Sequence, residues 1–189
     1  MKNINNYILE KLKKINSNNA PASYKVGDII EDYTIKDSKY NLVCVISGDD
    51  IEDGINRFMI DTDYILNPFG DNINIESKDE DDINGLENTK NIIKQYNRKI
   101  KRKSCAAYTI NTLYGDNVYA PAIGELKLIY KNIDIINKSL KNKINHGVII
   151  LSSTQLDKNL VFRFDTDSGK IRLLSKGVDR ALSFPFIQL

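Results

Sequence analysis

The chain has 189 residues, of which 41% are hydrophobic and 28% charged, and its formal net charge is only +2. These values fit one globular domain with a substantial core and exclude a disordered or fibrous chain. With two cysteines and one histidine, the chain lacks the residues for a disulfide framework or a Cys/His metal site, so we expect no metal and no cofactor.

The N-terminal residues 4–15 predict a short amphipathic helix. Their apolar positions are spaced by four, four and three residues, which places them on one face of a helix. A helix of about twelve residues is marginal alone in water, so this face packs on the chain's own core or on another protein. We favour another protein, because residues 17–23 read as a linker. The candidate partner-binding residues are Ile4, Tyr7, Ile8, Leu12 and Ile15.

The linker divides the chain into a docking segment, residues 1–23, and a domain, residues 24–189. In the first part of the domain, residues 41–46 and 57–60 are rich in apolar and β-branched residues and predict strands. Residues 61–82 read as a long surface loop that ends in an acidic run, residues 79–82. Calcium binding is the alternative for this run, but its spacing matches no loop motif, and we expect a solvated surface.

The middle of the chain predicts two helices. The first covers Leu86 to Tyr96, and the second follows Pro121 with apolar residues at steps of three and four from Leu126 to Leu140. The intervening Lys99 to Lys103 is a basic cluster without aromatic residues. We therefore expect a solvated face there and no nucleic-acid partner.

The last third of the chain predicts strands over residues 147–151, 160–164 and 170–174. The last two runs are joined by residues 165–169, which we interpret as a hairpin turn rather than a calcium loop because Gly169 stands where a ligand belongs. No apolar run approaches the roughly 20 residues of a membrane span, so we expect no membrane partner. The order of elements predicts an α+β fold with an antiparallel sheet.

Four blocks of sequence resemble the motifs of one family, in the same order. They are residues 24–30, similar to a "vGDiy" opening; residues 82–89, similar to "DGlaNT"; residues 119–126 with 129–130 and 135–137, similar to "LPSIGEL…LY…IN"; and residues 151–155, similar to "WSSTE". Together, over roughly residues 24–189, they resemble the bacterial and phage domains of unassigned function that share the C-type-lectin-like fold of formylglycine-generating enzyme. The resemblance implies an α+β fold with two helices and a twisted antiparallel sheet.

The chain departs from this family in ways that bear on chemistry. Ala122 replaces the usual serine, which removes half of a capping box with Glu125, and Leu151 replaces a tryptophan. The sugar-type calcium motifs Glu-Pro-Asn and Trp-Asn-Asp do not occur, and the copper-binding cysteine pair has no aligned counterpart. We therefore expect no enzyme, and we expect Cys44 and Cys105 to remain unpaired thiols.

Residues 152–154, Ser-Ser-Thr, have two readings. We expect their hydroxyls to bond buried backbone near a helix end. The rival is a serine nucleophile, which would need a nearby base, and His146 is the only histidine.

The N-terminal residues 1–15 resemble the opening of structural proteins in phages of gut Bacteroidales, including crAss-like phages. The resemblance implies a non-enzymatic virion protein, made in the host bacterial cytoplasm, that serves as a head or tail fibre, decoration or adaptor. Its expected partners are capsid, tail or fibre proteins, further copies of itself and a host-surface glycan or protein. The alternative is a bacterial ligand- or protein-binding module outside a virion, and the third reading is an enzyme with a divergent site.

Overall fold

The computed structural model describes residues 24–62, 64–70, 73–75, 77, 79–99, 105–176 and 181–189. The candidate partner-binding residues Ile4, Tyr7, Ile8, Leu12 and Ile15 lie outside the described residues, as do the rest of the docking segment and most of the basic cluster.

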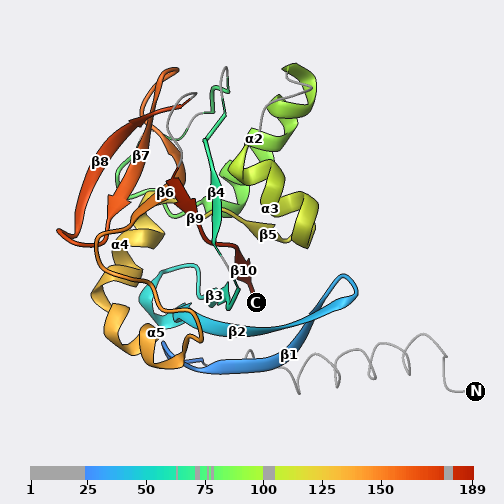
Figure 1. Cartoon of the computed structure of the whole chain (residues 1–189), viewed down its shortest axis with the longest axis vertical. Helices are drawn as coiled ribbons and strands as arrows, with labels where there is room; N and C mark the ends of the chain where they lie inside the picture. Colours follow the sequence, from blue (N-terminus) through green and yellow to red (C-terminus); the bar gives the residue numbers. More distant parts are fainter. Residues whose placement is uncertain are drawn as a thin grey trace, which may run out of the picture.

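Two five-stranded sheets form the framework (Figure 1). The first sheet is antiparallel, and its strands in spatial order are β1 (Ile29–Ile35), β2 (Ser38–Ile46), β3 (Arg57–Ile60), β10 (Phe186–Gln188) and β5 (Val118–Tyr119). The second sheet has the order β4 (Ile65–Asn67), β9 (Ala181–Ser183), β6 (Ile149–Gln155), β7 (Leu160–Asp165) and β8 (Lys170–Ser175). Only its β6–β9 pairing is parallel.

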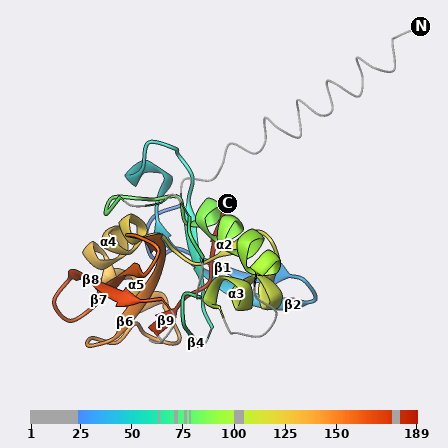
Figure 2. The ribbon, with the colours of Figure 1, turned by 90° about the horizontal axis from the view of Figure 1, so that it is seen from above.

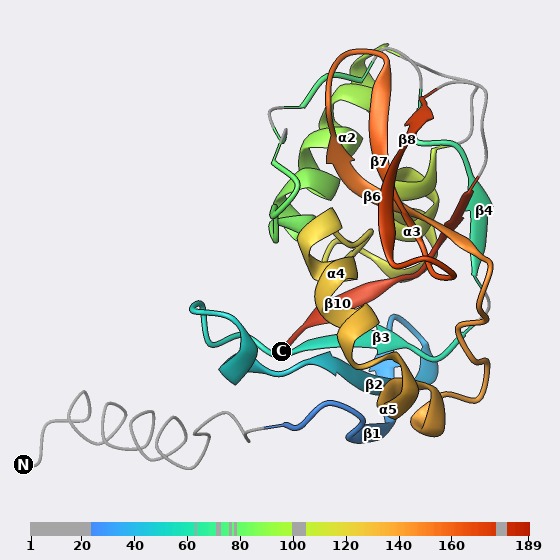
Figure 3. The ribbon, with the colours of Figure 1, turned by 90° about the vertical axis from the view of Figure 1, so that its left-hand side faces the viewer.

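Helices cover two sides of this framework, with α4 and α5 on one side and α2 and α3 on the other (Figures 1 and 2). The four α-helices of the described chain are α2 (Gly85–Lys99), α3 (Ala106–Tyr114), α4 (Ile123–Lys131) and α5 (Ile133–Ser139), and a 3-10 turn η1 spans Gly48–Asp50. Figure 3 shows α4 between the two sheets, and it contacts β2, β6 and β7.

The largest part of the core lies around α4. Val43 and Met59 of the first sheet, Leu126 and Ile129 of α4 and Phe164 of the second sheet are all buried in it. Burying such side chains contributes roughly 1.5–3 kcal/mol each, so α4 joins the two sheets mainly through apolar contact.

The chain crosses from one sheet to the other four times, once from β4 to β5 through α2 and α3 and three times through shorter connections. Residues 61–64 lead from β3 to β4, residues 140–148 lead from α5 to β6, and residues 184–185 lead from β9 to β10. The last connection makes the C-terminal segment part of both sheets, because β9 pairs with β4 and β6 while β10 lies between β3 and β5.

The α+β class and most of the longer elements agree with the sequence analysis. Strands β2, β3, β7 and β8 and helix α2 cover the ranges expected for them. The hairpin turn is confirmed: Gly169 has φ +66°, and its N–H donates to the Asp165 carbonyl at 2.9 Å. These elements carry strong local patterns, which is why their positions could be predicted.

The expectation of two helices and one sheet was wrong. The helix expected from Leu126 to Leu140 is broken at Asn132, which has φ −116° and ψ 13° and whose N–H bonds the carbonyls of Ile129 and Tyr130. The apolar spacing continues through Ile133 and Ile136 because α4 and α5 bury the same core, so the spacing alone hides the break. Helix α3 was not expected, and β4 lies in the expected loop.

Gly124 allows α4 to approach the acidic run closely. Its N–H donates to the Asp82 carbonyl at 2.8 Å. A Cβ atom at this position would meet the backbone oxygens of Asp81 and Asp82 at 2.6 Å, closer than real Cβ contacts. A side chain at residue 124 would therefore separate α4 from residues 81–82.

We expect Gly124→Ala to lower the free energy of unfolding by about 1–3 kcal/mol, because the close backbone approach resists repacking. This loss would come despite the intrinsic preference of helices for alanine, which by itself favours the variant by about 1 kcal/mol. Urea denaturation of the two proteins measures the difference. A variant as stable as the parent would show that α4 does not need this close approach.

Candidate functional site

The Glu125 carboxylate, in the first turn of α4, is fully buried. One oxygen accepts from Arg57 Nε at 2.7 Å and from the Tyr119 hydroxyl at 2.9 Å, and the other accepts from the Ala122 N–H at 2.7 Å. Burial raises the pKa of Glu125 to about 7 against these three hydrogen bonds.

Arg57 connects Glu125 to the protein surface. Its guanidinium, 1% exposed, donates to the partly exposed Asp53 carboxylate at 2.6 Å and to the Ile55 carbonyl at 2.9 Å. Burial by itself would lower the pKa of Arg57, but Asp53 and Glu125 outweigh it and raise that pKa above its ordinary value. The arginine is therefore held as a charged link between two carboxylates.

Asp82 and Thr154 form a second buried pair beside the first. Asp82 accepts from Thr154 Oγ1 at 2.8 Å and from the Asn88 side-chain amide at 2.5 Å. Thr154 Oγ1 in turn accepts from the Ile123 N–H at 3.0 Å. This bond supplies the helix cap that Ala122 cannot make. The expectation of a solvated acidic run was wrong for Asp82, which is 8% exposed.

The expectation that these hydroxyls bond buried backbone is confirmed for Ser152 and Thr154 and wrong for Ser153. Ser152 Oγ donates to the Phe162 carbonyl at 2.8 Å, and Thr154 Oγ1 accepts from the Ile123 N–H at the start of α4. The buried Ser153 hydroxyl has no hydrogen-bond partner in the described part of the chain, although the Ser153 N–H donates to the Pro121 carbonyl at 2.7 Å. Both serines are 1% exposed, whereas His146 is exposed in the connection from α5 to β6. The described structure thus gives neither serine the surface access that a nucleophile needs.

The two cysteines are free thiols, as expected, and both are buried. They belong to different core clusters, and Cys105 Sγ donates to the Phe69 carbonyl at 3.0 Å. Burial raises the pKa of Cys44 to about 12 and that of Cys105 to about 11, so neither is present as a reactive thiolate at neutral pH.

Lys176, at the end of β8, is a buried cation that the sequence analysis missed. It is 2% exposed. Its Nζ donates to the Ile73 carbonyl at 2.8 Å and to Gln155 Oε1 at 2.6 Å. The same Nζ lies 5.3 Å from the centre of the Phe69 ring. Gln155 also donates to the Asn74 side chain at 2.8 Å. Lys176 and Gln155 together hold residues 73–75 against the second sheet, and burial lowers the pKa of Lys176 to about 8.

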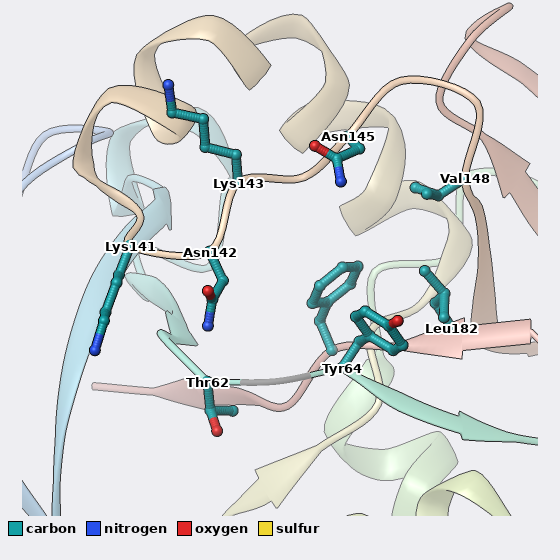
Figure 4. A pocket seen from close by; sticks show the side chains of 9 residues that line it. Thr62, Tyr64, Lys141, Asn142, Lys143, Asn145, Val148 and Leu182 are labelled. Carbon is teal, nitrogen blue, oxygen red and sulfur yellow. The ribbon is translucent and has the colours of Figure 1, made fainter.

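An open pocket lies where the three shorter connections cross between the sheets (Figure 4). We call it the seam pocket, and its volume is about 260 Å³. It is lined by Thr62 and Tyr64 from the first connection, by Lys141, Asn142, Lys143, Asn145 and Val148 from the second, and by Leu182 and Phe184 from β9 and the residue after it.

Side chains outside the pocket hold its longest wall, residues 140–148, in place. The Asp61 carboxylate accepts from the N–H of Lys141 at 3.0 Å. The Asn137 amide accepts from the Ile144 N–H at 2.7 Å and donates to the same residue's carbonyl at 3.0 Å. Thr166 Oγ1 donates to the Asn145 carbonyl at 3.0 Å. Held at three points, this irregular segment forms a largely pre-formed wall.

The described ranges hold no group of three or more His, Cys, Asp or Glu side chains placed to bind a metal ion. None of their helices is both long enough and apolar enough to cross a bilayer.

The pocket residues were not among the expected site residues, and their sequence offered few signals. Lys141 to Asn145 reads as a polar linker after a helix, and Tyr64 lay within the expected long loop. The sequence offered a better signal that Arg57 and Glu125 form a buried ion pair. Each is a charged residue next to an apolar run, and a charged side chain that is buried with such a run needs an oppositely charged partner.

Neither protein-family models nor curated proteins match the sequence. Among solved structures, the chain is similar to a fimbrial protein from Bacteroides ovatus ATCC 8483, with a TM-score of 0.51 and 11% sequence identity. The similarity covers 71% of this chain and 36% of the fimbrial protein. This chain thus corresponds to well under two thirds of that protein, and at this identity the likeness shows a common fold alone.

We expect Glu125→Gln to lower the free energy of unfolding by about 1–3 kcal/mol. The amide has the shape of the carboxylate but carries only one acceptor oxygen, so it leaves at least one of the three buried donors without an acceptor. Urea denaturation measures the change, with the exposed Glu52→Gln as the matched control. Equal effects of the two substitutions would contradict this role for Glu125.

The pKa of Lys176 predicts a pH dependence of stability. Because it is about 8 in the folded protein and 10.5 ordinarily, the unfolded chain binds the extra proton between these values. This group's contribution to the free energy of unfolding therefore rises with pH across that window. We expect the stability of the parent protein relative to Lys176→Met to increase from about pH 8 to 10.5, as measured by denaturation at several pH values. The exposed Lys170→Met should show no such slope, and a flat difference for Lys176→Met would contradict the prediction.

Proposed function

We propose that this chain is a non-enzymatic structural protein of a phage particle, where it acts as a head or tail fibre, decoration or adaptor protein and displays a C-type-lectin-like domain toward the host surface. The proposal that the protein is not an enzyme rests on what its buried charged and polar side chains contact. Glu125, Arg57, Asp82 and Thr154 are buried, and they bond one another or the backbone. Their hydrogen bonds and ion pairs stabilise the fold of the domain.

The mounting of the domain would use the apolar face of residues 4–15. Each buried side chain on that face contributes roughly 1.5–3 kcal/mol, and ordering the backbone opposes this by roughly 1–2 kcal/mol per residue. One such segment therefore binds a partner weakly. Many copies on a symmetric particle would bind firmly, because attachment at one point raises the effective concentration at the next.

A second candidate is a bacterial ligand- or protein-binding module outside a virion. The similarity to part of a fimbrial protein favours it, since that fold is found in a protein named for a surface assembly. Both candidates describe a display domain and differ in the assembly that carries it.

Deleting residues 1–20 should leave the melting temperature of the domain almost unchanged and abolish its incorporation into particles. Ile8→Asp should act in the same way, because it places a charge in the middle of the apolar face. Asn6→Asp is the matched control, since it adds the same charge outside that face. Incorporation is measured by immunoblot of gradient-purified particles from cells that express each variant.

Two outcomes would contradict the proposal. A truncated protein that melts many degrees lower would show that the apolar face belongs to the domain's own core. Wild-type protein recovered with bacterial surface structures, and not with particles, would replace the virion by the second candidate.

A further inference from the structure

Strand β8 forms a regular, open edge of the second sheet. All of its residues, Lys170–Ser175, pair with β7 in one register without a bulge. No strand of the described ranges pairs with its other side, and Figures 1 and 2 place it at the outside of the molecule. An edge of this kind presents unpaired N–H and C=O groups to which a strand of another chain can bind.

The other three sheet edges of the described chain have protection that β8 lacks. Strand β1 is interrupted by a bulge between Ile30 and Tyr33, where Asp32 has φ +54° and is exposed beside the exposed Glu31. Strands β4 and β5 have only three and two residues, and both contact α3. Bulges, charges, short strands and covering helices all hinder the pairing of an edge with another chain. The open edge of β8 is therefore the one that favours a partner strand.

The free backbone groups of β8 belong to Ile171, Leu173 and Ser175. In an antiparallel pair, every second residue exchanges hydrogen bonds with the facing strand. The Lys176 N–H, just after β8, donates to the Asn159 carbonyl at 3.0 Å. In the same register, the even-numbered residues of β8 therefore turn their N–H and C=O groups toward β7. The odd-numbered residues turn theirs outward.

The side chains of β8 leave this edge accessible. Leu173 is 43% exposed and lies on the same face as Ile171 and Ser175, because side chains alternate along a strand. Arg172, in the middle of the strand, contacts Asp165 of β7 at 3.0 Å, so its charge is balanced within the molecule. The middle of the edge thus presents an exposed apolar side chain beside free backbone groups.

The edge is complementary to a second copy of itself. When two β8 strands lie antiparallel with Leu173 opposite Leu173 of the second copy, Ile171 lies opposite Ser175, and the outward groups of all three residues find partners. A shift that places Ile171 opposite Leu173 would put Arg172 directly opposite Arg172 of the second copy, and like charges in that position destabilise a strand pair. The opposite shift would leave Ile171 beyond the end of the facing strand. The sequence of β8 therefore favours the register centred on Leu173.

We propose that two copies of this chain associate through β8, antiparallel and related by a two-fold axis at Leu173, so that their second sheets join into one. The interface is small, and small interfaces are typical of weak, reversible complexes. We therefore expect a dissociation constant between about 10 μM and 1 mM. This inference goes beyond the proposed function and does not depend on it.

The test is sedimentation equilibrium of the full chain at concentrations from about 10 μM to 1 mM. We expect a monomer–dimer equilibrium that Leu173→Lys weakens at least about tenfold, because it places two like charges opposite each other and removes the leucine contact. The matched control is Leu113→Lys, since Leu113 is 53% exposed on α3, and it should dimerise as the parent does. Circular dichroism melts check that both variants fold.

Two further measurements test the register and the location. An equimolar mixture of Leu173→Lys and Leu173→Glu should dimerise more tightly than either variant alone, because opposite charges would then face each other across the two-fold axis. Ile8→Asp should leave dimerisation unchanged, which separates β8 from any association through residues 4–15.

Four results would overturn the proposal. These are a monomer at every concentration up to about 1 mM, equal weakening by Leu173→Lys and Leu113→Lys, no recovery in the mixture of the two charge variants, or a dimer that Ile8→Asp abolishes. All are recorded on the free chain, so none of them bears on whether residues 1–20 mount the protein on a particle. Loss of incorporation into particles likewise leaves the sedimentation result unchanged.

Discussion

The burial of one carboxylate, that of Glu125, constrains much of this fold. A carboxylate that leaves water needs a counter-charge and a donor for each exposed lone pair. Here β3 supplies Arg57, β5 supplies Tyr119 and the chain before α4 supplies the Ala122 N–H. The start of α2 also lies against it, since a Cβ atom on Gly85 would stand 2.4 Å from the carboxylate. The positions of two strands and two helices are therefore mutually dependent.

The remaining buried polar groups extend this arrangement to the second sheet. Thr154 of β6 caps α4 and donates to Asp82. Lys176, the residue after β8, donates to the Ile73 carbonyl. Polar contacts of this kind are directional, so they select one arrangement of elements that apolar contact alone would leave less defined. The seam pocket lies outside this network, beside three of the four connections between the sheets. A pocket can open there without breaking a buried hydrogen bond.

The agreement between sequence and structure follows the length of the elements. Strands β2, β7 and β8 and helix α2 have enough residues for an apolar pattern to repeat, and they were predicted. Strands β4, β5, β9 and β10 have two or three residues each, too few for an apolar pattern to repeat. They are strands because they pair with neighbouring strands in the two sheets. The break at Asn132 was missed for a related reason, because both resulting helices bury the same core and the apolar spacing continues across it.

The sequence by itself determined the α+β class, the hairpin before Lys170, the buried thiols and the internal role of Ser152 and Thr154. Local pattern, turn chemistry and apolar surroundings suffice for these. Only the tertiary structure decided that Arg57, Asp82 and Lys176 are buried and that Tyr64 and Lys141 line one pocket. A charged side chain is buried only where partners neutralise it. Those partners are remote along the chain: 68 residues separate Arg57 from Glu125 and 72 separate Thr154 from Asp82.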